Sequence, residues 1–180
     1  MINRLYVLKK KNIILLCLVL LVILTIIAIG FVSTKKYGLI YYKEVEKISS
    51  EYALDCNLVM AIIKTESSFD ENAVSRANAI GFMQLVPPTA EWVAANNNIE
   101  YSEKLLFDYK YNIKLGCLYF KYLLTRFDEN WAIIAYNAGE TNVKRWIEAG
   151  IQQDEIPFKE SREYLKRVQE NRKLYDRIFK

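Results

Sequence analysis

Apolar residues along most of this chain recur every three or four positions, the spacing of a helix with one buried face. Tyr41, Val45, Ile48 and Tyr52 show this spacing first, and a longer series follows within residues 108–127. No segment alternates apolar and polar residues in the manner of a half-buried strand. The pattern therefore predicts an all-α domain.

Capping and helix-breaking residues set the ends of the predicted helices. Asp55 is placed to cap a helix that carries Glu66, and Gly139 to end a short helix. The predicted elements are a helix from Asp55 through Glu66, a polar loop over 68–80, a helix that begins at prolines and stops at 96–98, a long helix over 108–127, a short helix ending at Gly139, and an amphipathic helix over about 160–179.

An uncharged apolar run precedes this domain. Residues 13–33 are long enough to cross a bilayer, which takes about 20 residues. Positive charge is heavier before the run, at Arg4 and Lys9 to Lys11, than after it, at Lys35 and Lys36. This bias places the N-terminus in the cytoplasm. The sequence predicts a cytoplasmic basic N-terminus over 1–12, one transmembrane helix over 13–33, and an extracytoplasmic domain over 34–180.

A cleaved signal peptide is the competing interpretation of the same run. Its apolar region would span only about 7–15 residues before a small-residue cleavage site. Here the run is longer, and "AIG" at 28–30 is a poor site. The pattern favours an uncleaved, single-pass anchor in the cell membrane.

Charge and composition exclude several classes of function. The net charge of +4 equals the four basic residues before the apolar run, because the rest of the chain carries 21 basic and 21 acidic residues. This balance gives no basic patch for nucleic acid. The chain has no His, which excludes imidazole metal ligands and His-dependent triads. For Cys56 and Cys117, two packed thiols are favoured over a disulfide.

Glu66 lies where a charge is unexpected. On a helix of 3.6 residues per turn, Glu66 falls in the middle of the stripe formed by Val59, Ile62 and Ile63, and Lys64 points the other way. Burial raises the pKa of a carboxyl, which would keep this acid protonated near neutral pH. The alternative to a buried acid is that Glu66 is an ordinary, half-exposed carboxylate at the end of a helix.

Four motifs together resemble the catalytic domain of Slt-type lytic transglycosylases over about residues 40–170. They occur in the family's order and are "ESSFDENAVSRANAIGFMQLVPPTA", "NIKLGCLYFKYLLTRF", "AIIAYNAGETNVKRW" and "IPFKESREYLKRV". The resemblance implies a lysozyme-like fold and cleavage of peptidoglycan glycan strands between N-acetylmuramic acid and N-acetylglucosamine. It implies that Glu66 acts first as acid and then as base, so that a 1,6-anhydro ring closes and no water is consumed.

The resemblance also implies residues that bind substrate. Ser75 matches a contact near the acid, with a turn-forming serine as the equal alternative. In "GFMQ", Gly81 would allow close approach of a sugar, Phe82 replaces the family's Leu, and Gln84 offers a donor and an acceptor. Val86 stands where many relatives have Met.

In "AYN", Tyr136 is expected to donate a hydrogen bond to Glu66, and Asn137 to bind an acetamido group. Tyr164 is a candidate for the wall of the groove, and Glu160 is expected to be solvated. The proposed chemistry needs no cofactor, and the sequence shows no metal-binding cluster.

Two other functions stay open. A hydrolytic muramidase on the same fold would need a second carboxylate, for which Asp70 and Glu71 are the candidates, although both are expected to be loop residues. A catalytically silent wall-binding module of a secretion, conjugation or sporulation assembly is the other. The aromatic residues are mostly expected in the core or near the membrane rather than stacked on sugars.

Overall fold

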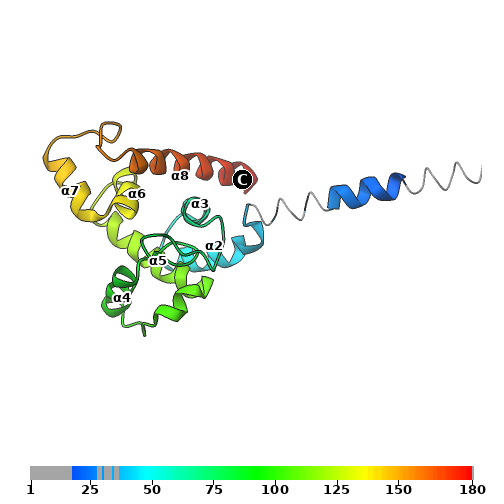
Figure 1. The fold of residues 1–180 in the computed structure, drawn as a ribbon, viewed down its shortest axis with the longest axis horizontal. Helices are drawn as coiled ribbons and strands as arrows, with labels where there is room; N and C mark the ends of the chain where they lie inside the picture. The colour runs from blue at the N-terminus through cyan, green and yellow to red at the C-terminus, as the bar shows by residue number, and fades with distance from the viewer. Residues whose placement is uncertain (1–17, 28–29, 31–33, 35–36, 180) are drawn as a thin grey trace, which may run out of the picture. The chain divides into compact units, whose positions relative to one another are not determined.

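A computed structural model describes residues 18–27, 30, 34 and 37–179 (Figure 1). The chain divides into two units, residues 1–37 and 38–180. In the first unit, residues 18–27 are helical, with exposed apolar side chains. No helix among the described residues is both long and apolar enough to cross a membrane. The predicted segment 1–12 and much of the predicted anchor over 13–33 lie outside the described residues.

The second unit is helical, as the spacing of apolar residues predicts. Its described residues contain only isolated β-bridges, Val74 with Ile80 and Ile80 with Leu85. The helices, in chain order, are η1 (Leu39–Tyr41), α2 (Tyr42–Glu51), α3 (Cys56–Glu66), α4 (Pro87–Asn96), η2 (Glu103–Phe107), α5 (Tyr109–Leu124), α6 (Glu129–Ala138), α7 (Glu140–Glu148) and α8 (Lys159–Ile178).

The helix ends follow the local capping chemistry. The Asp55 side chain accepts a hydrogen bond from the Asn57 N–H at the start of α3, as predicted. Gly139, with φ 85°, ends α6, also as predicted. The predicted helix over 108–127 is shorter, because Asp108 caps it from outside and the chain turns after Leu124. The 3₁₀ helix η2 was not predicted.

Helix α3 forms the centre of the unit. All six residues from Leu58 to Ile63 are buried. A helix that is apolar on all sides needs neighbours on all sides. In Figure 1 it lies beside α2 and α8, and its most extensive contact is with α8. This packing brings the C-terminal helix, distant in sequence, onto the helix that carries Glu66.

The core has two hydrophobic clusters. The larger one surrounds α3 and includes side chains of α2, α5, α6 and α8. The smaller one joins α4 to the 80–85 loop, η2 and α5. Tyr119 and Tyr136 pack against both clusters. Cys56 and Cys117 are free thiols, as predicted, and Cys117 is buried.

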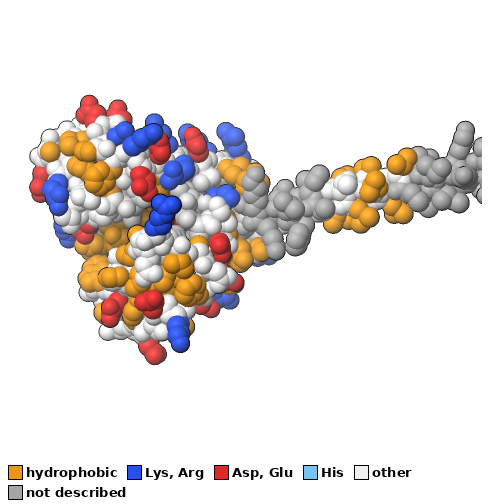
Figure 2. All heavy atoms as spheres, viewed as in Figure 1, with side chains coloured by type: hydrophobic (Ala, Val, Ile, Leu, Met, Phe, Trp, Pro, Cys, Tyr) orange, Lys and Arg blue, Asp and Glu red, His pale blue; other side chains and the backbone are white. Residues whose placement is uncertain are grey.

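Charged side chains are spread over the surface of the second unit, as Figure 2 shows. Hydrophobic side chains gather on the face between α4 and the α6–α7 pair.

Candidate active site

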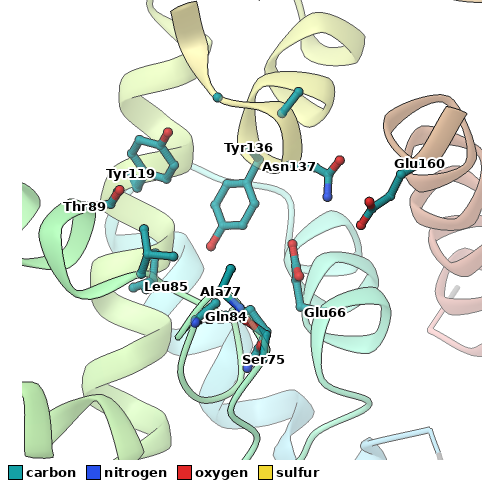
Figure 3. Close-up of a pocket in the computed structure, with 14 residues that line it drawn as sticks. Glu66, Ser75, Ala77, Gln84, Leu85, Thr89, Tyr119, Tyr136, Asn137 and Glu160 are labelled. Carbon is teal, nitrogen blue, oxygen red and sulfur yellow. Dashed lines mark hydrogen bonds between the residues drawn. The ribbon is translucent and has the colours of Figure 1, made fainter. Parts of the chain in front are cut away.

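A cavity of about 450 Å³ lies above the C-terminal end of α3. Figure 3 shows its labelled side chains, which come from α3, the 67–86 loop and helices α4, α5, α6 and α8. Five of the predicted site residues line this cavity: Glu66, Ser75, Gln84, Tyr136 and Asn137. The fold therefore gathers residues that are up to 71 positions apart, from Glu66 to Asn137, around one carboxyl group.

Glu66 is the last residue of α3 and is partly buried. Burial raises the pKa of its carboxyl to about 7. The hydrogen bond from Tyr164 and the charge of Arg167 act in the opposite direction, and the charge of Glu160 adds to the rise. The acid therefore keeps a protonated fraction near neutral pH, and the protonated form is the one that general acid catalysis requires.

The tyrosine that contacts Glu66 is Tyr164, not Tyr136. The Tyr164 hydroxyl donates to Oε1 of Glu66 at 2.7 Å. The Tyr136 hydroxyl instead donates to the carbonyl of Met83 at 2.8 Å, so the predicted bond from Tyr136 to Glu66 is wrong. Tyr164 is only 1% exposed and does not line the cavity, so the prediction that it forms the wall of the groove is wrong. Its position points to orientation of Glu66 rather than contact with substrate.

Asn137 presents its amide to the cavity in a fixed orientation. Its Oδ1 accepts a hydrogen bond from the Ser161 hydroxyl at 2.8 Å. The nitrogen consequently points into the cavity, on the side of Glu66 and Glu160 (Figure 3). An amide N–H₂ in this place suits the carbonyl oxygen of an acetamido group.

Gln84 and Ser75 are both partly engaged by the loop that carries them. Nε2 of Gln84 donates to the carbonyls of Ala73 and Gly81, at 3.1 and 2.9 Å, which leaves Oε1 as the free acceptor. Oγ of Ser75 accepts from the N–H groups of Ala77 and Ala79, at 3.2 and 3.0 Å. Ser75 is thus the predicted turn former and also lines the cavity, with its own O–H left to donate.

Gly81 and Phe82 do not line the cavity. Gly81 has φ 76°, and a Cβ there would lie 2.4 Å from the Leu106 carbonyl oxygen and 2.5 Å from Nδ2 of Asn112. The close approach that Gly81 allows is therefore to protein rather than to sugar. Phe82 is fully buried and packs edge-on against Tyr41, with ring centroids 4.9 Å apart.

Asn112 is a structural residue of the site that sequence reasoning missed. It is fully buried in α5, and its Oδ1 accepts from the Met83 N–H at 2.7 Å. Its Nδ2 donates to the carbonyls of Ile80 and Leu106, at 2.8 and 2.9 Å. The signal was an amide among apolar residues on the inner face of a predicted helix. Asn112 fixes the loop from which Gln84 reaches the cavity.

Glu160 is the second carboxylate of the cavity. The sequence suggested a solvated side chain, and Glu160 is indeed exposed, but its carboxylate points toward Glu66 across the cavity (Figure 3). Asp70 and Glu71, the predicted candidates, are exposed loop residues outside the cavity, and Asp70 accepts from the Asn72 N–H. Within the described part of the chain, no group of three or more Cys, Asp and Glu residues is arranged to hold a metal ion.

Residues 43–158 match the family model described as the transglycosylase SLT domain. The chain belongs to this family. It is 32% identical over 168 residues to a membrane-bound lytic murein transglycosylase C of Edwardsiella ictaluri, an alignment that covers 77% of this chain and 47% of that protein. The curated relatives are longer, and the chain spans 20% to 47% of the first two of them.

Solved structures of the SLT family have the same fold. The 70 kDa soluble lytic transglycosylase of Escherichia coli superposes with a TM-score of 0.72 at 30% identity, over 77% of this chain and 24% of that one. An inactive mutant of the lytic transglycosylase Slt of Pseudomonas aeruginosa gives 0.73 at 27% identity, over 78% and 24%. The predicted all-α, lysozyme-like class of the second unit is confirmed by this likeness.

Proposed function

We propose that this SLT-family chain is a lytic transglycosylase that cleaves the β-1,4 bond between N-acetylmuramic acid and N-acetylglucosamine in peptidoglycan. The observation that carries the proposal is Glu66, a carboxyl with a pKa of about 7 in a cavity lined by amide and hydroxyl groups. The names of its curated relatives, lytic murein transglycosylases, support the same activity.

In the proposed reaction Glu66 acts twice. Its protonated form gives the proton to the bridging oxygen as the bond from that oxygen to C1 of the muramic acid breaks. The carboxylate then takes the proton of the C6 hydroxyl, whose oxygen forms a bond to C1 and closes a 1,6-anhydro ring. Glu66 thus regains the proton that it gave away, and no water enters the product.

The neighbours of Glu66 suit these two roles. Tyr164 holds one carboxylate oxygen, so the acid keeps one orientation through both proton transfers. Burial keeps a fraction of the acid protonated near neutral pH, and the Asn137 amide offers a donor for an acetamido oxygen of the bound sugar.

The deciding experiment is mass spectrometry of peptidoglycan digested by the full chain in detergent. We expect muropeptides one water lighter than reducing-end products. Glu66→Gln should release none and still bind the wall, because the amide cannot donate and recover the proton. Glu71→Gln, which alters an exposed carboxyl of the neighbouring loop, is the matched control and should keep turnover. Turnover unchanged in Glu66→Gln would overturn the assignment of the acid.

A hydrolytic muramidase is the second candidate, and the position of Glu160 favours it. A carboxylate across the cavity from the acid could activate a water for attack on C1. Reducing-end products that disappear in Glu160→Gln would establish this alternative. A folded chain that binds peptidoglycan without releasing products would instead favour the wall-binding module.

We also propose that residues 13–33 anchor the protein in the cell membrane, with the second unit outside the cytoplasm. The apolar run, the heavier positive charge before it and the membrane-bound name of the Edwardsiella relative support this placement.

A further inference from the structure

Positive charge in the second unit is concentrated on its last helix. Residues 38–158 carry 11 basic and 17 acidic residues, whereas α8 carries seven basic and four acidic ones. Figure 2 shows Lys and Arg side chains, with some acidic ones among them, along the edge of the unit where α8 runs. One helix is therefore positive on a unit that is otherwise negative, a distribution that favours contact with an anionic surface.

Four cations form one stripe along the outer face of α8, and all four are exposed: Lys159, Lys166, Lys173 and Arg177. Their spacing of seven, seven and four residues keeps them within about 20° of a common line on a helix of 3.6 residues per turn. The buried side chains Tyr164, Val168 and Tyr175 lie about half a turn away. This basic stripe is about 27 Å long and faces away from the core.

Most of the basic stripe has no internal partner. Lys159 pairs with Glu163 at 3.5 Å. The other three cations make no ion pair with any residue that the structure describes, although Glu170 borders the stripe. Exposed cations without an internal partner remain available to an anion outside the protein, and a rigid helix holds these in a row.

The C-terminal end of α8 packs on the residues where the second unit begins. Phe179, directly after α8, stacks on Tyr42 at the start of α2 with ring centroids 3.4 Å apart. Two apolar side chains next to these rings along the chain are exposed, Ile40 by 60% and Ile178 by 41%. Exposed apolar side chains beside cations are typical of a surface that contacts the headgroup region of a membrane.

The proposed membrane anchor over 13–33 ends five residues before Gly38, the first residue of the second unit. Even fully extended, five residues span at most about 18 Å. Two of them, Lys35 and Lys36, are basic. A connection this short keeps the first residues of the unit, and the end of α8 that packs on them, near the membrane surface.

We propose that the basic stripe of α8 docks on anionic phospholipid headgroups of the membrane that the anchor crosses, with Ile40 and Ile178 at the headgroup boundary. The inference rests on the proposed anchor and is independent of the chemistry at Glu66. Each basic side chain held at an anionic membrane adds to the attraction, which salt screens. Because Glu160 of α8 lines the cavity of Glu66, docking would hold this cavity close to the membrane.

The test measures how fast an uncharged amine-reactive reagent labels single lysines of the full chain in lipid nanodiscs, with mass spectrometry as the readout. The discs contain phosphatidylcholine alone, or phosphatidylcholine with an equal amount of phosphatidylglycerol. The reporter lysines Lys166 and Lys173 should react about fivefold more slowly in the anionic discs. Salt at about 1 M should abolish this difference, because it shortens the screening length to about 3 Å. Lys104 and Lys121, exposed on η2 and α5, should react equally in both discs.

Two double variants separate docking from an effect of net charge. Lys159→Gln with Arg177→Gln removes two cations of the stripe, and should bring the reporter lysines close to their rate in neutral discs. Lys121→Gln with Arg145→Gln is the matched control, since it removes the same charge from exposed positions of α5 and α7. It should leave the reporter lysines slow in the anionic discs. Circular dichroism and thermal unfolding of each variant identify a misfolded chain.

Several results would overturn the docking of α8. These are equal labelling of the reporter lysines in both discs, slow labelling that persists at high salt, or the same change of rate in both double variants. Slow labelling that requires an added glycerol-phosphate polymer, and does not occur with phosphatidylglycerol, would assign the stripe to a wall polymer instead. A chain that is not retained in the discs would overturn the anchor and this docking together, and would leave the proposed activity to the digestion experiment.

Discussion

At the scale of single residues, the chemistry of the site depends on a balance around one carboxyl. Burial raises the pKa of Glu66, whereas the Tyr164 hydroxyl and the Arg167 charge lower it. A hydroxyl that donates to a carboxylate stabilises the charged form. Removing a group that lowers the pKa of Glu66 should raise the pH at which the acid ionises. Removing a group that raises this pKa should lower that pH.

Tyr164→Phe removes the hydrogen bond to the ionised form, so the pKa of Glu66 should rise further. The alkaline limb of activity, where the acid loses its proton, should then move to higher pH by about one unit. The measurement is the pH profile of muropeptide release. Tyr136→Phe is the matched control: it removes a hydroxyl bonded to the Met83 carbonyl, and it should leave the midpoint in place even if turnover falls. A midpoint that stays, or moves down, in Tyr164→Phe would contradict the role of this bond.

Glu66 should also make stability depend on pH. Its pKa is about 7 in the folded state, against an ordinary value of 4.5. The native state therefore binds more protons than the unfolded state between these values, and its stability falls as pH rises through this window. Glu66→Gln removes the titrating carboxyl, so this fall in stability with rising pH should be absent from the variant.

The unfolding temperature of Glu66→Gln relative to the unaltered chain should accordingly increase between about pH 4.5 and pH 8. Thermal unfolding at both values measures the difference. Glu71→Gln, an exposed carboxyl, should not reproduce the trend. If the difference in unfolding temperature between Glu66→Gln and the unaltered chain is the same at both pH values, burial does not destabilise the ionised form of Glu66.

At the scale of elements, the site depends on how a loop without regular structure is held against helices. The loop after α3 supplies Ser75 and Gln84, and Asn112 of α5 binds two backbone groups of this loop, at Ile80 and Met83, and one of η2, at Leu106. A buried side chain that satisfies several backbone groups is costly to remove, because each is left without a partner.

Asn112→Ala should lower the free energy of unfolding by about 3 kcal/mol, since the Met83 N–H and the Leu106 carbonyl lose the partner that Asn112 gives them in the core, whereas the Ile80 carbonyl keeps its bond from the Leu85 N–H. Urea denaturation measures the change. Turnover should fall as well, with the pH midpoint unchanged, because the loop moves but the acid does not. Asn96→Ala, an exposed asparagine at the end of α4, should stay within about 0.5 kcal/mol of the unaltered chain. Equal stability of the two variants would refute the role of Asn112.

At the scale of the whole molecule, an apolar N-terminal run is joined to a unit with the SLT fold. If residues 13–33 are an uncleaved anchor, the full chain should sediment with membranes and resist extraction by alkaline carbonate. Added protease should reach the second unit in spheroplasts. A processed chain found free of the membrane would identify a signal peptide instead. A protected second unit would place it on the cytoplasmic side.

Features that depend on neighbours along the chain could be predicted from the amino-acid sequence. Apolar spacing predicted the helices, Asp55 and Gly139 predicted two of their ends, and the apolar stripe around Glu66 predicted a buried acid. These three predictions are confirmed because helix periodicity, capping and burial on one face are local properties of the chain. The four motifs extended the prediction to the fold and to five residues of the cavity.

Tertiary structure alone decided which groups surround the acid. Tyr136 and Tyr164 are both tyrosines of recognisable motifs, but only the packing of α8 on α3 brings the Tyr164 hydroxyl to Glu66. The same packing places Glu160 in the cavity. Local pattern could not predict these contacts, because helix packing joins residues far apart in sequence and the directions of their side chains follow from the geometry at which the helices cross.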